Sequence, residues 1–172
     1  LAISENTVSN TYSIPDKGEF EILTVGRLSA DERYKGHDLT LHALACLKKK
    51  NILIKYNIVG SGDDLARLKT LALDLGIQSQ VNFLGYLSDK EVSSVYLRSS
   101  FFVMPSHVIR RKSDIWGGEG FGLVYLEAAH YGLPVIACNE GGQPDCIIDG
   151  ETGFLVNPSA PEIAKKILQL KN

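Results

Sequence analysis

Long apolar runs are absent from this sequence of 172 residues. A membrane-spanning helix needs roughly 18–20 consecutive apolar residues, and no stretch approaches that length. A strong charge of one sign is also lacking, because 18 Lys and Arg face 20 Asp and Glu and leave a net charge of −2. Nothing in this balance directs the protein to nucleic acid or to an anionic membrane, so no nucleic-acid partner is expected.

Cysteine and histidine are too few and too scattered to indicate a metal site. The cysteines, Cys46, Cys138 and Cys146, are odd in number and lack the spacing of metal ligands. The four histidines are dispersed along the chain, and a surface or loop position suits each of them. We therefore predict no bound metal, reduced thiols in a cytoplasmic protein, and burial of Cys46 and Cys138.

Methionine occurs once, as Met104, and the chain begins at Leu1. Since an open reading frame starts with Met, we expect this chain to be a piece of a longer protein. Residues 1–18 are polar and lack apolar periodicity, which is typical of a linker arriving from a preceding domain. Residues 19–172 are enough for one domain with a sizeable core.

From Phe20 onward, short apolar runs alternate with helical patterns. The runs are typical of strands buried on both faces and comprise Phe20–Val25, Ile52–Val59, Val81–Leu84, Phe101–Met104, Pro134–Cys138 and Phe154–Val156. Apolar periodicity and end signals predict helices at Asp38–Lys50, Asp63–Leu75, Ser88–Ser99, Phe121–Tyr131 and Pro161–Leu170. The alternation predicts an α/β fold, a Rossmann-like, doubly wound parallel sheet of six strands.

Local signals refine this outline. Asp63 or Asp64 is expected to cap the second helix, and Gly76 to end it. A polar loop is predicted between Pro105 and Gly118. In a doubly wound sheet, ligands bind outside the carboxyl ends of the strands, so the loops that follow the strands are the places to look for chemistry.

The loop after the first strand carries two cations. Arg27 stands directly after Gly26, and Lys35 follows before Gly36. A planar guanidinium and a mobile ammonium at the carboxyl end of a strand would form a clamp for a diphosphate. Two solvated loop residues are the alternative, and the two cations alone leave both interpretations open.

Gly60-Ser61-Gly62 follows the second strand and opens a helix. Such a pair of glycines is compatible with a phosphate close to the backbone at a helix N-terminus. The dinucleotide fingerprint needs a third glycine three residues later, where this chain has Leu65. Asp63 and Asp64 would also repel a pyrophosphate, so an oxidoreductase of this fold is disfavoured.

The segment Glu119-Gly120-Phe121-Gly122-Leu123-Val124-Tyr125-Leu126-Glu127 holds two glutamates eight positions apart. The first precedes a predicted helix and the second lies about two turns inside it, which gives roughly 12 Å along the axis. That span suits one carboxylate on sugar hydroxyls, the other on a ribose, and a diphosphate between them at the bare helix N-terminus. A first-turn Glu favoured by the helix dipole and a second Glu on a solvated face are the alternative.

Taken in order, these segments resemble glycosyltransferase family 4 (group 1). The resemblance rests on Gly26-Arg27-Leu28 with Lys35-Gly36, Gly60-Ser61-Gly62, Val81-Asn82-Phe83-Leu84-Gly85, Glu119 to Ala129, Gly132-Leu133-Pro134-Val135-Ile136-Ala137 and Asp149-Gly150 with Gly153-Phe154-Leu155-Val156. It covers the chain from Phe20 to its end. The resemblance implies a GT-B fold of two facing Rossmann-like domains, of which this chain is the C-terminal, donor-binding one, with the N-terminal acceptor domain outside it.

The resemblance also implies roles for individual residues. Arg27 and Lys35 would bind the donor diphosphate and stabilise the departing nucleotide, and Glu119 would hold sugar hydroxyls. Glu127 would hold the ribose. The backbone of Phe121 and Gly122 would lie near the phosphates and that of Leu84 and Gly85 near the base, with the remaining donor contacts from Gly26, Gly60, Gly62 and Leu123. No cofactor and no metal are expected, because cations and a helix dipole supply the charge stabilisation.

The sequence departs from the family pattern in two places. His107–Gly118, with Arg110-Arg111-Lys112 and Trp116, separates Pro105-Ser106 from the Glu119 segment. This insertion is similar to a loop of some lipid-directed mannosyltransferases, and a solvated flexible loop is the alternative. The chain also stops at Asn172, so we expect the helix that crosses back to the N-terminal domain to be truncated or to lie outside this chain.

The implied activity is transfer of a hexose from a UDP- or GDP-linked sugar to an acceptor hydroxyl with retention, in the synthesis of polysaccharide, lipopolysaccharide or glycolipid. The saccharide or lipid-linked acceptor would bind the other domain, which leaves this chain inactive alone. The full-length enzyme is expected in the cytoplasm, with peripheral attachment to the inner face of the membrane as one possibility. A nucleotide-sugar epimerase of the same fold and a non-catalytic nucleotide-binding module remain as alternatives.

Overall fold

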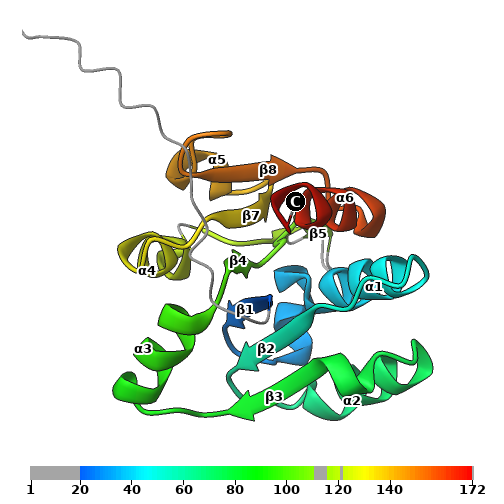
Figure 1. The fold of residues 1–172 in the computed structure, drawn as a ribbon. Coiled ribbons are helices and arrows are strands. Elements are labelled where there is room, and N and C mark those ends of the chain that lie inside the picture. The colour runs from blue at the N-terminus through cyan, green and yellow to red at the C-terminus, as the bar shows by residue number, and fades with distance from the viewer. Residues whose placement is uncertain (1–19, 111–115, 121, 172) are drawn as a thin grey trace, which may run out of the picture.

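The computed structural model describes residues 20–110, 116–120 and 122–171 and arranges them in three layers (Figure 1). The middle layer is a sheet of six described strands in the order β3-β2-β1-β4-β7-β8, and every neighbouring pair is parallel. The strands are β1 (Glu21–Val25), β2 (Lys55–Val59), β3 (Val81–Gly85), β4 (Phe101–Val103), β7 (Val135–Cys138) and β8 (Gly153–Val156). The predicted fold class is confirmed, whereas the predicted linker, residues 1–18, lies outside the described residues.

Helices cover both faces of the sheet (Figure 1). One face carries α1 (His37–Lys48), α2 (Leu65–Asp74) and α6 (Ala160–Lys171), and the other carries α3 (Asp89–Arg98) and α4 (Leu123–His130). All five predicted helices are present. Three short elements were not predicted, because they are too brief for apolar periodicity: the 3₁₀ helices η1 (Ala30–Lys35) and η2 (Gln78–Gln80), and α5 (Gln143–Cys146).

The two faces of the sheet hold two separate hydrophobic cores. Ile22 of β1 and Phe101 of β4 pack with α1, α2 and α6, whereas Leu23 and Phe102, the next residue on each strand, pack with α3 and α4. Successive side chains of a strand point to opposite faces, so a strand covered on both sides is apolar at most of its positions. This is why the strands were visible as continuous apolar runs.

Two local predictions about α2 have different outcomes. Gly76 ends the helix as predicted, with a left-handed φ of 68° and its amide donating to the Leu73 carbonyl at 2.8 Å. Asp64 occupies the N-cap position, as predicted, but its side chain makes no capping hydrogen bond in the described part of the chain. Its carboxylate instead accepts hydrogen bonds from Arg33 and Arg67.

The prediction that two cysteines are buried holds for one of them. Cys138 is fully buried on β7, and burial raises the pKa of its thiol to about 12, so the thiol is protonated at neutral pH. Cys46 is half-buried, since its position on α1 lies at the rim of that helix's contact with α6. No helix among the described residues is both long and apolar enough to cross a membrane.

The loops after β1 and β2 touch backbone to backbone. The amide of Gly26 donates to Val59 at 2.9 Å, and the amide of Leu28 donates to Ser61 at 3.0 Å. A Cβ on Gly60 would collide with the carbonyl oxygen of Gly26, and one on Gly62 with that of Leu28. Close approach of protein backbone, rather than of a ligand, is therefore sufficient to require glycine at both positions.

Gly62→Ala is expected to lower the free energy of unfolding by about 1–3 kcal/mol, because the added methyl group must push two loop backbones apart. Gly120→Ala is the matched control, since Gly120 also lacks a left-handed φ and a Cβ there meets nothing within 4 Å. The control should stay within about 0.5 kcal/mol of the parent in urea unfolding. Equal stability of the two variants would contradict the packing role of Gly62.

Candidate functional site

The order of the strands places a crevice between β1 and β4. From β1 the chain proceeds to β2 and β3 on one side, and from β4 it proceeds to β7 and β8 on the other. The loops that leave β1 and β4 therefore run in opposite directions at the carboxyl edge of the sheet. This topological switch point is where open α/β sheets bind ligands.

The two cations predicted in the β1 loop lie on either side of one carboxylate. Arg27 and Lys35 both contact Glu32: a guanidinium nitrogen of Arg27 is paired with Oε1, and Lys35 Nζ lies 3.5 Å from Oε2. The Glu32 and Lys35 side chains are 13% exposed, whereas that of Arg27 is 77% exposed. The structure thus brings the two predicted cations together at the sheet edge.

Glu32 was missed by sequence reasoning. It lies three residues before Lys35 within η1, where the backbone at Glu32 itself departs from helical geometry. That spacing was the available signal, but η1 itself was not predicted.

The β1 loop is attached to the β4 loop as well. The Lys35 side chain passes over Gly26 near Met104, since a Cβ on Gly26 would lie 3.7 Å from Lys35 Cδ and 3.9 Å from Met104 Sδ. Gly36 has a left-handed φ of 74° and packs against the Pro105 carbonyl. The His107 amide also donates to the Tyr34 carbonyl at 2.8 Å. These contacts hold Lys35 at the switch point.

Glu119 lies in the loop before α4. Its carbonyl accepts the Gly142 amide at 3.1 Å, which ties the loop to the start of α5. Its carboxylate oxygen Oε2 is buried and has no hydrogen-bond partner among the described residues. Buried polar atoms are nearly always paired, so this oxygen is an unsatisfied acceptor within the described part of the chain.

Helix α4 begins later than predicted. It starts at Leu123, after Gly122, which adopts a left-handed φ of 67°. Glu127 is therefore four residues into the helix, about one turn or 6 Å along the axis, and the predicted two turns are wrong. The reason is the backbone conformation of Gly122, which breaks the helical path. Phe121 lies outside the described residues.

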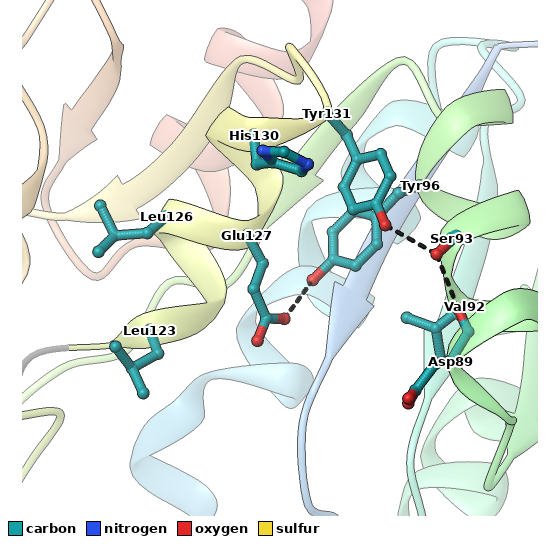
Figure 2. A pocket seen from close by; sticks show the side chains of 9 residues that line it. All are labelled: Asp89, Val92, Ser93, Tyr96, Leu123, Leu126, Glu127, His130 and Tyr131. Carbon is teal, nitrogen blue, oxygen red and sulfur yellow. Dashed lines mark hydrogen bonds between the residues drawn. The ribbon is translucent and has the colours of Figure 1, made fainter.

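A cavity of about 510 Å³ lies between α3 and α4 (Figure 2). Leu123 and Glu127 of α4 line one side and Asp89 and Tyr96 of α3 the other. The Tyr96 hydroxyl donates a hydrogen bond of 3.1 Å to Glu127 Oε2. Two residues of the predicted donor site, Leu123 and Glu127, thus share one cavity.

The remaining predicted positions lie along the same sheet edge. Leu84 and Gly85 end β3, and the Gly85 carbonyl accepts the Gly60 amide at 2.8 Å, which joins the ends of β2 and β3. Leu84 is half-buried and packs into the core beneath α3 and α4. Gly60 and Gly62 serve the backbone contacts described above, and their contact with a donor stays a prediction.

The insertion after β4 differs from the polar loop predicted for it. Within its described part, Ile109–Arg110 (β5) pairs antiparallel with Trp116–Gly117 (β6), while residues 111–115 lie outside the described residues. The Val108 amide donates to the Glu140 carboxylate at 2.8 Å. β5 and β6 were not predicted because each has only two residues, too few to show an alternating pattern.

A second cluster of charges lies beneath the β1 loop. Asp64 is 4% exposed and accepts hydrogen bonds from Arg33 at 2.6 Å and from Arg67 at 2.6 Å. Burial would raise the pKa of Asp64, but the hydrogen bonds and charges of Arg67 and Arg33 outweigh it, and the pKa is lowered. In the described ranges no group of three or more His, Cys, Asp or Glu is placed to hold a metal ion.

The fold and the edge site define the class of domain: a Rossmann-like, doubly wound sheet of the kind found in GT-B glycosyltransferases. Residues 11–172 match the family described as glycosyl transferases group 1. The chain belongs to this family, which confirms the resemblance drawn from its motifs.

Individual relatives agree with this assignment. The chain is 35% identical over 123 residues to a GDP-mannose-dependent alpha-(1-6)-phosphatidylinositol monomannoside mannosyltransferase of Mycolicibacterium smegmatis, covering 72% of this chain and 31% of that protein. It is 37% identical over 150 residues to an uncharacterized glycosyltransferase of Haemophilus influenzae, covering 87% of this chain and 38% of that protein. The chain spans about a third of the length of the curated relatives it matches.

Solved structures show the same fold. The crystal structure of Anabaena Alr3699/HepE in complex with UDP and glucose matches with a TM-score of 0.75 and 25% identity, over 90% of this chain and 39% of that one. A glycosyltransferase from Rickettsia africae matches with a TM-score of 0.74 and 27% identity, over 90% of this chain and 38% of that one.

Asp64→Asn should lower the free energy of unfolding at pH 7 by about 1–3 kcal/mol, less than for a fully buried pair because both arginines are partly exposed. Asp64 has a lowered pKa when folded, and an unfolded Asp has a pKa of about 3.9. The stabilisation is therefore complete above about pH 5 and is lost progressively as the pH falls from about 4 through the lowered pKa of the folded state. Urea unfolding at pH 7 and pH 3 measures it.

The neighbouring exposed Asp63 provides the control. Its carboxylate accepts the Ala30 amide at 2.8 Å, so Asp63→Asn keeps an acceptor there and should change stability less. A stability difference between Asp64→Asn and the parent that is the same at both pH values would show that the charge of Asp64 is not what stabilises the fold.

Proposed function

We propose that this chain is the nucleotide-sugar-binding domain of a retaining glycosyltransferase that transfers a hexose to an acceptor hydroxyl. The observation that carries the proposal is the pairing of Arg27 and Lys35 with one carboxylate at the switch point of a group 1 glycosyltransferase domain. Two cations held side by side at this edge suit the diphosphate of a sugar nucleotide.

The other groups fit the other parts of such a donor. The buried, unpaired oxygen of Glu119 suits a sugar hydroxyl. Glu127, on the cavity between α3 and α4, suits the hydroxyls of the ribose, because a carboxylate only accepts hydrogen bonds. Support for a sugar nucleotide comes from two comparisons: the M. smegmatis relative is named as GDP-mannose-dependent, and the Anabaena structure contains UDP and glucose.

Catalysis in this proposal rests on charge stabilisation and positioning. Negative charge develops on the diphosphate as the bond to the anomeric carbon breaks, and Arg27 and Lys35 would stabilise it. The acceptor would attack from the face that the nucleotide leaves, through an oxocarbenium-like transition state, so that the configuration is retained. No metal takes part, since the cations supply the positive charge.

The acceptor would bind the second domain of the GT-B pair, so this chain by itself is expected to bind donor without transferring sugar. The proposed products are polysaccharide, lipopolysaccharide or glycolipid. We place the full-length enzyme in the cytoplasm, at the inner face of the membrane when its acceptor is lipid-linked.

Calorimetric titration of this chain with UDP, GDP, ADP and the corresponding sugar nucleotides tests the proposal. One nucleotide is expected to bind, with Arg27→Ala and Lys35→Ala each weakening it. In the full-length enzyme each substitution should lower turnover about a hundredfold or more, as expected for lost leaving-group stabilisation. Near-normal turnover in either variant would refute its role.

Lys49→Ala is the control for these substitutions. Lys49 is the C-cap of α1, which begins at the carboxyl edge of the sheet and runs to the opposite edge, so the loss of its charge should leave binding unchanged. Net isomerisation of the sugar nucleotide by the full-length enzyme without an acceptor would indicate an epimerase instead.

Glu32→Gln separately tests the diphosphate position. The carboxylate of Glu32 pairs with both cations, so a diphosphate must displace it. Glutamine keeps the size of the side chain but carries no charge. Inorganic pyrophosphate should therefore bind roughly three- to tenfold more tightly to this variant. Asp31→Asn removes the same charge one residue away and should have a smaller effect. Weaker binding to Glu32→Gln would show that Glu32 acts by orienting the cations.

A further inference from the structure

We infer that Tyr96 is a positioning residue for Glu127 and thereby sets the affinity of the α3–α4 cavity for a ligand with neighbouring hydroxyls. The inference rests on the proposed function, because it takes Glu127 as the group that holds a ribose. It adds a residue that no motif in the sequence indicated.

The position of the Tyr96 ring is fixed by packing. The residue is 1% exposed, and its ring lies parallel to that of Tyr131, with centroids 4.8 Å apart and 5° between the planes. On β4, the fully buried Phe102 stacks at 6.2 Å and 22°. A ring held by two aromatic neighbours in a core leaves its hydroxyl little freedom to move.

Glu127 is exposed and has no comparable packing. A free Glu side chain on a helix surface samples many rotamers, and ordering it costs conformational entropy. The Tyr96 hydroxyl donates to Oε2 of this carboxylate at 3.1 Å (Figure 2), a bond that selects one orientation before a ligand arrives. A carboxylate accepts about four hydrogen bonds, so sites remain for two ligand hydroxyls.

The Tyr96 hydroxyl also remains a donor. Burial, followed by the negative charge of Glu127, raises the pKa of Tyr96 well above its ordinary value. The hydroxyl is therefore protonated throughout the neutral range. It can supply the hydrogen bond without adding a second negative charge to the cavity.

The same wall offers a matched control. Tyr131 is stacked on Tyr96, but its hydroxyl lies 2.7 Å from Ser93 Oγ (Figure 2). Tyr96→Phe and Tyr131→Phe each remove one oxygen atom and keep both rings. They differ in whether the lost hydroxyl contacts Glu127.

The test is calorimetric titration of the chain with UDP and GDP, with their 2′,3′-dideoxy analogues and with inorganic pyrophosphate. Tyr96→Phe should weaken binding of the ribonucleotide by about tenfold or more, the lower end of the range for loss of a hydrogen bond to a charged group. The dideoxy analogue and pyrophosphate should change less than twofold. Tyr131→Phe should change none of the ligands by more than twofold.

A double-variant cycle shows whether Tyr96 acts through Glu127. After Glu127→Gln, adding Tyr96→Phe should cost less than a further twofold. Glu127→Asp, which withdraws the carboxylate from Tyr96 and leaves the tyrosine intact, should give the same ligand pattern as Tyr96→Phe. This variant also provides the test if Tyr96→Phe does not fold.

Each contrary result has a distinct meaning. Three results would overturn the positioning role and leave the proposed function intact. They are an equal loss of affinity for the dideoxy analogue, an equal loss of ribonucleotide affinity in Tyr131→Phe, and additive losses of affinity in the double-variant cycle. Unchanged ribonucleotide binding by Glu127→Gln would refute the ribose assignment and the inference with it, while pyrophosphate binding would still report on Arg27 and Lys35.

Discussion

The backbone of the β1 loop is held between the loops that follow β2 and β4, and the candidate site depends on that contact. On one side, Gly60 and Gly62 lack a Cβ and so leave room for the carbonyl groups of Gly26 and Leu28. On the other side, Gly36 packs against Pro105. Any side chain at these positions would separate the loops. Because the contact is made of backbone on both sides, it fixes the path of the loop, and with it the positions from which both cations extend.

Charge pairing then divides the cations of this loop into two groups. Arg33, which stays about half exposed, is neutralised together with Arg67 by the buried Asp64. The exposed Arg27 and the largely buried Lys35 share Glu32. A buried carboxylate with two arginines is a structural tie, since removing one partner would leave a buried charge unpaired. In the proposed function Glu32 would instead give way to the diphosphate, because the exposed Arg27 lies beside it.

The two ends of the proposed donor would meet different kinds of surface. The diphosphate would meet the exposed Arg27 and the more buried Lys35, which ends the kinked segment η1. The nucleoside would meet Glu127, whose partner Tyr96 stacks on the fully buried Phe102 and is continuous with the core of the sheet. The fixed hydroxyl of Tyr96 suits the part of the ligand that is recognised by hydrogen bonds, and the two cations suit the part whose charge changes during transfer.

The sequence by itself determined the six strands, the five longer helices and the motifs of the sheet edge. Covered parallel strands are continuous apolar runs and amphipathic helices repeat apolar residues at a fixed spacing, so both can be recognised from residues close together in the sequence. It also placed Arg27, Lys35, Glu119 and Glu127 in the loops and helix at that edge. The tertiary structure alone decided which groups meet: Tyr96 bonds Glu127 across 31 positions, and Asp64 bonds Arg33 across 31, distances over which no local pattern acts. Only the structure showed that Gly122 delays α4 and that Glu32 joins the two cations, since backbone conformation and side-chain direction depend on packing.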